Sequence, residues 1–265
     1  NVFILISWYT SVGNTWSPVT PNNSNPNPLF PCGSSPLYLG RATPFFLYSS
    51  LIFSSTYHAG GPVGYGRYGN ESWSALETAI SQLEGGETLS FSSGMAAISA
   101  VFSILPIGAP VVASNQGYSG TMGLLNQHHA SGRLEVRFVD ITNTEEVIGA
   151  MKGAALLWLE SPTNPCLDLA DLPALISAAK KLTIGVGVDN TFATPLVQQP
   201  LSMGADIVMH SVTKFLAGHS DVVLGSLSTC DTALLKRLDE SRRFNGSIPG
   251  PFEAWLALRG IRTFP

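Results

Sequence analysis

Charged residues are scarce in this sequence, and its first quarter almost lacks them. Only 12% of the 265 residues are Asp, Glu, Lys or Arg, about half of the roughly 25% that is usual in soluble domains. No charged residue precedes Arg41, which is the only one before Arg67. In the same stretch, seven prolines between Pro18 and Pro44 interrupt both helical and strand periodicity. The composition predicts a Pro/Asn-rich N-terminal arm over residues 1–53, with the folded domain after it.

Three further absences argue against whole classes of protein. The net charge of −4 comes without the clustered Lys and Arg of a nucleic-acid-binding surface. No apolar run reaches the roughly 20 residues of a transmembrane helix, and Val2–Ile6 lacks the basic flank of a signal peptide. The three cysteines have no CxxC pair and no spacing typical of a zinc site or a disulfide framework. We expect no nucleic-acid partner, no membrane and no metal, and a cytoplasmic location.

Alternating helix and strand patterns begin at Ser72. The first helix has apolar residues at helical spacing from Leu76 to Leu83, with Ser72 and Ser74 as possible caps and Gly85 as its stop. Further helices are predicted over 94–105, 120–129, 144–152 and 172–182. Short apolar runs predict seven strands, over 88–92, 110–114, 134–140, 155–160, 184–189, 206–210 and 222–228. This alternation predicts an α/β domain, in which a mostly parallel seven-stranded sheet carries helices on both faces.

Ligands of such sheets bind at the carboxyl ends of the strands, where three features stand out. Ser92–Ala97 are small residues that open a helix, so they form either an anion cradle or merely a tight turn. Asp189 ends a buried strand and there needs a cation or several donors, unless it is a cap or turn residue. Lys214, with Ser211 and Thr213 beside it, is either a desolvated nucleophile flanked by phosphate ligands or a surface lysine.

Together these three features indicate pyridoxal 5′-phosphate (PLP). This cofactor needs a phosphate site, a lysine for its Schiff base and an acid that keeps its ring nitrogen protonated. A nucleotide-binding α/β domain is the alternative. It predicts a GxGxxG or Walker turn after the first strand, and neither occurs there.

From about Ser55 to its end, the sequence resembles the Cys/Met-metabolism (trans-sulfuration) PLP enzymes. This family includes cystathionine γ-synthase, cystathionine γ-lyase, cystathionine β-lyase and methionine γ-lyase. The resemblance implies the PLP-dependent transferase fold (fold type I) and a homodimer or homotetramer with shared active sites. It rests on seven ordered motifs: Tyr65–Asn70, Leu76-Glu77 with Leu83–Gly85, Ser92–Ala97, Tyr118–Thr121, Glu160–Pro165, Val188–Phe192 and Ser211–Asp221.

The resemblance also implies roles for individual residues. Lys214 would form the internal aldimine and then shuttle protons, Tyr118 would stack on the ring and assist proton transfer, and Asp189 would pair with the pyridinium nitrogen. The remaining implied contacts with PLP are Ser93, Gly94, Met95, Ser211 and Thr213 around the phosphate, Asn164 near the ring hydroxyl, and Tyr65 and Arg67 at the phosphate of a neighbouring subunit.

The sequence departs from the family pattern at two positions and at both ends. Glu71 stands where the family has a proline, and Gly120 where methionine γ-lyases carry a cysteine, which favours a γ-synthase or γ-lyase.

The expected divisions are the divergent arm 1–53, a family arm 54–71 with the cross-subunit motif, a PLP-binding domain 72–248, and residues 249–265, which begin the connection to a C-terminal α+β domain. That domain, with its arginine for the substrate carboxylate, has no counterpart here.

The leading hypothesis is a PLP-dependent trans-sulfuration enzyme of cysteine and methionine metabolism, acting on a small amino-acid substrate by elimination or replacement. The rival is a truncated, catalytically weak PLP-binding homologue, because the carboxylate-binding arginine is missing. Outside the motifs, Arg242 and Arg243 are expected on a solvated helix face, and His219 in a loop near Lys214 with no metal.

Overall fold

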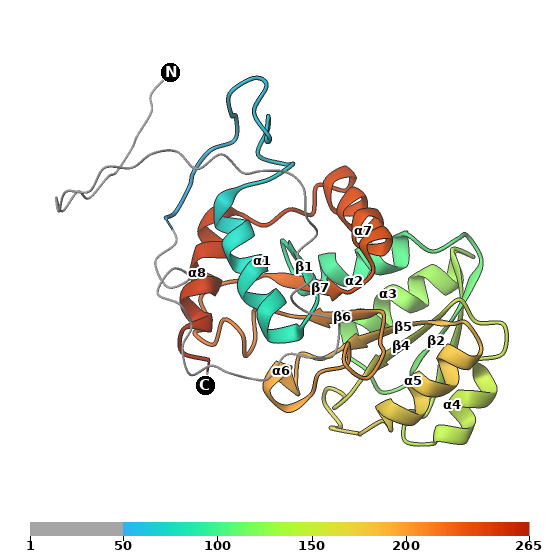
Figure 1. Cartoon of the computed structure of the whole chain (residues 1–265). Coiled ribbons are helices and arrows are strands. Elements are labelled where there is room, and N and C mark those ends of the chain that lie inside the picture. Colours follow the sequence, from blue (N-terminus) through green and yellow to red (C-terminus); the bar gives the residue numbers. More distant parts are fainter. Residues whose placement is uncertain (1–49, 265) are drawn as a thin grey trace.

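A seven-stranded sheet forms the centre of the computed structural model, which describes residues 50–264 (Figure 1). Its order is β1-β7-β6-β5-β4-β2-β3. The strands from β6 to β3 are parallel, and β7 is antiparallel to both of its neighbours. The predicted α/β class and mostly parallel sheet are confirmed. The strands are β1 (Glu87–Phe91), β2 (Ala109–Ser114), β3 (Leu134–Val139), β4 (Leu156–Glu160), β5 (Gly185–Asp189), β6 (Ile207–His210) and β7 (Gly225–Thr229).

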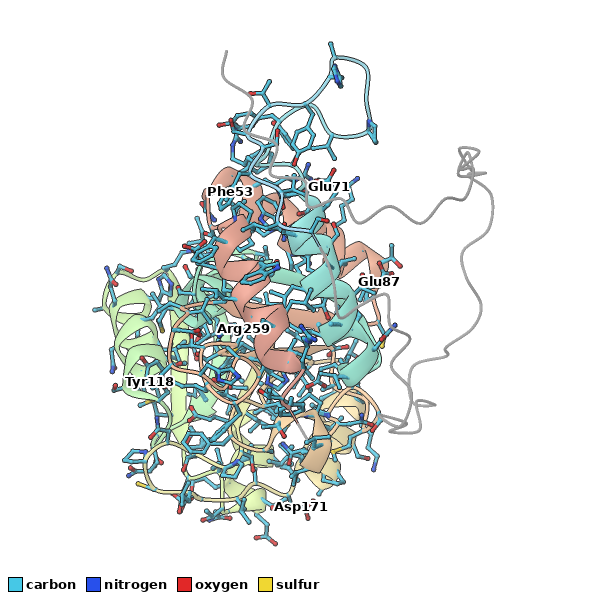
Figure 2. The ribbon with its side chains drawn as sticks, turned by 90° about the vertical axis from the view of Figure 1, so that its left-hand side faces the viewer. Phe53, Glu71, Glu87, Tyr118, Asp171 and Arg259 are labelled. Carbon is cyan, nitrogen blue, oxygen red and sulfur yellow. The ribbon has the colours of Figure 1, made fainter. Side chains whose placement is uncertain are left out.

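Helices cover both faces of this sheet. One face carries α2, α3 and α7, and the other carries α1, α4 and α5, while α8 lies beside α1. Figure 2 shows this pair, with Glu71 at the start of α1 and Arg259 on α8. None of the described helices has the length and hydropathy needed to cross a membrane. The helices are α1 (Glu71–Glu84), α2 (Gly94–Ser103), α3 (Ser119–Ala130), α4 (Thr144–Ala150), α5 (Leu172–Lys181), α6 (Thr194–Val197), α7 (Thr232–Phe244) and α8 (Pro251–Ile261).

The strands bury apolar side chains on both faces because successive residues point in opposite directions. On β4, Trp158 packs with α2 and α3, whereas Leu157 and Leu159 pack with α4 and α5. Continuous apolar runs of this kind are therefore needed to fill two cores, which explains why they were visible in the sequence.

Two sequence expectations near α1 and β7 are wrong. Asn70, and not a serine, caps α1, because its Oδ1 accepts a hydrogen bond from Ser72 N at 2.9 Å. The last strand begins at Gly225, three residues later than predicted. Val222 and Leu224 are apolar because they are buried with α1 and α8, not because they pair in the sheet. Nearly all of the predicted N-terminal arm lies outside the described residues; only 50–53 lie within them.

The expectation of a solvated face at Arg242 is also wrong. Arg242 is only 5% exposed, and its Nη1 donates hydrogen bonds to Glu77 Oε1 at 2.7 Å and to Ser90 O at 3.0 Å. Its guanidinium also lies 5.7 Å from the centre of the Trp73 ring. The charge pattern of α7 alone could not show this, because both partners come from distant parts of the chain.

Candidate active site

The predicted anion cradle lies at the start of α2. Ser93 caps this helix through its Oγ, which accepts a hydrogen bond from Ala96 N at 3.0 Å. The N–H groups of Gly94 and Met95 belong to the first turn, which has no acceptors within the helix. A Cβ at Gly94 would lie 3.2 Å from Ser211 Oγ, and one at Gly225 would lie 2.3 Å from Ser93 O. Glycine at these positions lets the helix start approach β7 and Ser211, so the structure brings the two predicted phosphate segments together.

Asp189 lies beside this cradle at the end of β5 and is 6% exposed. Its Oδ1 accepts hydrogen bonds from Thr191 N at 3.0 Å and Thr191 Oγ1 at 2.6 Å. Thr191 Oγ1 in turn accepts from Ser211 N at 2.8 Å. Thr191 therefore joins the buried carboxylate to the cradle, a role that the sequence analysis did not assign.

The electrostatics of Asp189 test whether the site suits PLP. Burial raises the pKa of Asp189, while the hydrogen bonds from Thr191 and the proximity of His210 act in the opposite direction. Within residues 50–264, no Lys or Arg pairs with Asp189, and no group donates a hydrogen bond to its Oδ2. A protonated ring nitrogen would supply both a donor and a positive charge. The residues present fit the cofactor.

Lys214 follows β6 in a turn next to the cradle. Its N–H donates to Ser211 O at 3.0 Å, and its carbonyl accepts from Gly218 N at 2.8 Å. The residue is exposed, so of the two alternatives for Lys214 the described chain has the surface lysine. Neighbouring Thr213 uses its hydroxyl to donate to Leu224 O and to accept from Leu224 N, both at 3.0 Å. Of the two predicted hydroxyl ligands, Ser211 is the one that faces the start of α2.

Tyr118 and Asn164 reach the same region from two other segments. Tyr118 precedes α3 and is 39% exposed, so it is not a core tyrosine. A Cβ at Gly120 would lie 2.6 Å from Cε1 of the Tyr118 ring and 2.8 Å from Met95 Sδ. The ring therefore lies over Gly120 and next to the cradle residue Met95.

Glu160 connects Tyr118 to Asn164, and the sequence analysis gave it no role. Its Oε2 accepts from Tyr118 N at 2.7 Å, and its Oε1 accepts from Asn164 N at 2.8 Å. Glu160 pairs in register with Asp189 on the adjacent strand and is 5% exposed. Burial, followed by the charge of Asp189, raises the pKa of Glu160 to about 7. The signal was available, since a carboxylate ends a buried strand here as it does at Asp189.

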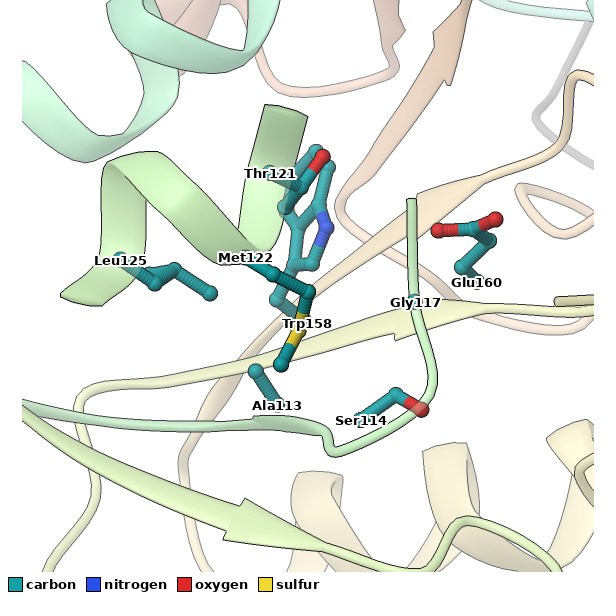
Figure 3. A pocket seen from close by; sticks show the side chains of 8 residues that line it. All are labelled: Ala113, Ser114, Gly117, Thr121, Met122, Leu125, Trp158 and Glu160. Carbon is teal, nitrogen blue, oxygen red and sulfur yellow. The ribbon is translucent and has the colours of Figure 1, made fainter. Parts of the chain in front are cut away.

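A small cavity lies next to Glu160 (Figure 3). It has about 10 Å³ of water-accessible space, close to the least that one water molecule needs. Thr121 Oγ1 and Trp158 Nε1 border it, and both are buried without a hydrogen-bond partner in the described structure. The cavity suits a single water molecule and is too small for an aromatic cofactor.

Behind Asp189 lies a second buried network that the sequence analysis missed. His210 Nε2 is hydrogen-bonded to Glu84 Oε1, and Asn190 Nδ2 donates to the same oxygen at 3.3 Å. All three residues are buried. The pair His210 and Glu84 thus supports the ends of β5 and β6, from which the site residues emerge.

Tyr65 and Arg67 belong to loop 54–70, which projects from the body of the domain (Figure 1). The Arg67 guanidinium lies 5.4 Å from the centre of the Tyr65 ring and 5.3 Å from that of Tyr68. Its Nη1 also donates to Arg243 O at 3.5 Å. These contacts hold Arg67 within the loop and against α7, so the structure does not bring Tyr65 and Arg67 together with the predicted site residues at the strand ends.

An α/β sheet whose strand ends carry an anion cradle, a buried carboxylate and a lysine is typical of PLP-dependent enzymes. Comparison with known proteins leads to the same class. The model of the Cys/Met metabolism PLP-dependent enzyme family matches residues 33–265, so the match starts earlier than Ser55, where the motifs begin. The chain belongs to this family.

Individual relatives carry several enzyme names. The cystathionine gamma-lyase of Bacillus subtilis is 42% identical over 201 residues, which cover 75% of this chain and 53% of that protein. The cystathionine beta-lyase MetC of the same species is 38% identical over 218 residues, 82% of this chain and 56% of that protein. A crystal structure of cystathionine gamma synthase from Xanthomonas oryzae pv. oryzae in complex with cystathionine has a TM-score of 0.79 and 36% identity, over 81% of this chain and 58% of that one. The chain spans about half the length of these curated relatives.

Proposed function

We propose that this chain is the PLP-binding part of a trans-sulfuration enzyme of the cystathionine γ-synthase or γ-lyase type. The observation that carries the proposal is the unbroken series of contacts from Ser211 through Thr191 to Asp189, beside the start of α2. This series supports a phosphate site next to the buried acid and the turn of Lys214, at the carboxyl ends of the strands. Family membership supports the same reading.

Each candidate residue has a task that its position allows. Ser93, Gly94, Met95 and Ser211 would bind the phosphate, chiefly through N–H groups at the start of α2. Asp189 would hold a proton on the ring nitrogen, and its burial strengthens that attraction. Tyr118 would cover one face of the ring, and Asn164 would orient the ring hydroxyl. Bound PLP stabilises the negative charge that forms on a substrate carbon when a proton leaves it.

Lys214 would hold the cofactor covalently through Nζ and, once released, would move a proton between carbons of the substrate. The phenol of Tyr118 would assist this transfer. The Tyr118 ring lies next to Gly120, as does the Sδ atom of the cradle residue Met95. Thr213 would contribute to the phosphate site only after its hydroxyl leaves Leu224. Tyr65 and Arg67 would act at the phosphate of a second copy of the chain, in a homodimer or homotetramer located in the cytoplasm.

Gly120 favours γ-chemistry of this type over a methionine γ-lyase. A cysteine side chain at position 120 would collide with the Tyr118 ring and Met95 as they now lie, since a Cβ would be 2.6 Å and 2.8 Å from them. The proposed substrates are cystathionine and O-succinylhomoserine.

The test combines covalent trapping with product analysis. Borohydride reduction of the purified chain with PLP should attach the cofactor to Lys214, as measured by peptide mass spectrometry. Lys214→Ala should abolish the attachment, whereas Lys236→Ala, a change of an exposed lysine on α7, should not. With cystathionine, γ-cleavage releases cysteine and β-cleavage releases homocysteine. Trapping elsewhere than on Lys214 would overturn the binding proposal, and release of homocysteine alone would overturn the γ assignment.

A further inference from the structure

Glu160 is a buried carboxylate at the end of β4 for which the proposed function provides no task. Its side chain is hydrogen-bonded to two of the segments that carry predicted contacts with the PLP ring. One oxygen holds the backbone at Tyr118, before α3, and the other holds the backbone at Asn164, after β4. These two segments are far apart in the sequence, and Glu160 lies between them.

The surroundings of Glu160 leave little room for another arrangement. A Cβ at Gly117 would lie 3.2 Å from Glu160 Oε2, so the chain before Tyr118 passes close to the carboxylate. Figure 3 shows Gly117 and Glu160 next to each other at the edge of the small cavity. An ionised carboxylate accepts through both oxygens, whereas a protonated carboxyl or an amide uses one side as a donor. Only the ionised form satisfies both N–H groups.

We propose that Glu160 is a positioning residue, which sets the mutual placement of Tyr118 and Asn164 and thereby the orientation of the PLP ring between them. The inference rests on the proposed function, because it concerns residues assigned to the ring. Glu160 itself does not touch the reacting atoms. It acts through the two backbone segments that it holds.

The position of Glu160 beside Asp189 gives this arrangement a pH dependence. Two titratable residues of the described site adjoin the Glu160 carboxylate, Asp189 on β5 and Tyr118 before α3. Burial and the Asp189 charge raise the pKa of Glu160 to about 7. Above this pH the ionised carboxylate holds both segments, and below it the protonated carboxyl releases one of them. Ring orientation should therefore become less well defined as the pH falls through about 7.

The test compares Glu160→Gln with Asp206→Asn. Asp206 also accepts a hydrogen bond from the backbone of a neighbouring strand, Val186 N at 2.7 Å, but it precedes β6 and so lies at the opposite end of the sheet. Loss of a hydrogen bond to a charged group should weaken PLP binding by about tenfold in Glu160→Gln. Asp206→Asn should bind PLP as the unaltered chain does. Fluorescence titration gives the Kd for PLP in each case.

Circular dichroism of the bound cofactor separates positioning from a purely structural role. In the unaltered chain the visible band should gain intensity as the pH rises from 6 to 8, and this step should be absent in Glu160→Gln. If Glu160→Gln does not fold, Glu160→Asp keeps the charge but is too short to reach both N–H groups, so it should show the same weakened binding. Unchanged Kd and dichroism in the folded variant would overturn the inference. An unaltered chain that binds no PLP would overturn the proposed function and this inference with it.

Discussion

The strand-end site and loop 54–70 both contain residues predicted to bind PLP, yet they are held in different ways. At the strand ends, Asp189 and Glu160 are buried and each accepts two hydrogen bonds. In the loop, Tyr65 and Tyr68 are 46% and 52% exposed, and Arg67 makes one long hydrogen bond to the body of the domain. The packing of this chain alone thus prepares the first region. Residues Tyr65 and Arg67 of the loop are predicted to contact PLP that is bound by another copy of the chain.

The largest effect on the strand-end site is expected from a substitution at Gly225. An alanine there would bring Cβ within 2.3 Å of Ser93 O and 2.8 Å of Gly94 Cα. Because backbone atoms cannot move aside as side-chain ends can, we expect a loss of about 3 kcal/mol in the free energy of unfolding and loss of PLP binding. Denaturant unfolding and PLP titration measure the two effects.

Gly185 on β5 offers the matched control for that change. A Cβ there would lie 3.4 Å from Ala155 O, which is an ordinary contact. Gly185→Ala should therefore keep both stability and PLP binding. Equal losses in the two variants would show that the approach of β7 to α2 is not what shapes the cradle.

A milder change at Gly120 should alter the site without unfolding it. Gly120→Ala pushes against the Tyr118 ring and Met95 Sδ, which are side-chain atoms that can move. We expect PLP binding to weaken by about tenfold, because the variant loses roughly one good contact between aromatic rings, worth about 0.5–1.5 kcal/mol. The visible absorbance band of the bound cofactor should also shift.

Gly123, one helical turn along α3, is the control for Gly120. No atom lies within 4 Å of a Cβ there. Gly123→Ala should stabilise the helix by about 0.5–1 kcal/mol and leave PLP binding unchanged. If Gly120→Ala also left PLP binding and the absorbance spectrum unchanged, Tyr118 would not contact the PLP ring.

The smallest effect is expected at Arg67, and it should depend on protein concentration. Its present contacts, with two exposed rings and Arg243 O, contribute little to the domain itself. In dilute monomer, Arg67→Ala should leave the Kd for PLP unchanged, and in the assembled state it should raise the Kd by about fivefold or less. Sedimentation velocity with PLP titration distinguishes the two states. The same change at every concentration would contradict a contact between subunits.

Much of the fold could be predicted because strand and helix periods leave a direct trace in the sequence. The runs at β2, β4 and β5 are apolar on both faces, and α5 has a clear amphipathic pattern after its cap Asp171. The same logic failed at Val222–Leu224, where burial under α1 and α8 imitates a strand. It also gave no indication of α8, because the sequence of this segment does not distinguish a packed helix from a connecting segment.

For the site, sequence reasoning selected candidate residues at the ends of three strands. These candidates are the cradle at Ser93–Met95 after β1, Asp189 at the end of β5, and the turn of Lys214 after β6. Thr191 and the pair of His210 with Glu84 were missed, because their roles depend on which segments are neighbours in the fold. Glu160 was missed although it ends a buried strand, and its link to Asp189 depends on the register of β4 and β5.

By itself, then, the sequence determined the chemistry available at each strand end, since local patterns specify which residues follow a strand and which open a helix. Tertiary structure alone decided which of these groups meet. The register that pairs Glu160 with Asp189, and the glycines that let β7 approach α2, are contacts between segments distant in the chain. Burial at those contacts, and not residue type, raises the pKa of the Glu160 and Asp189 carboxyls.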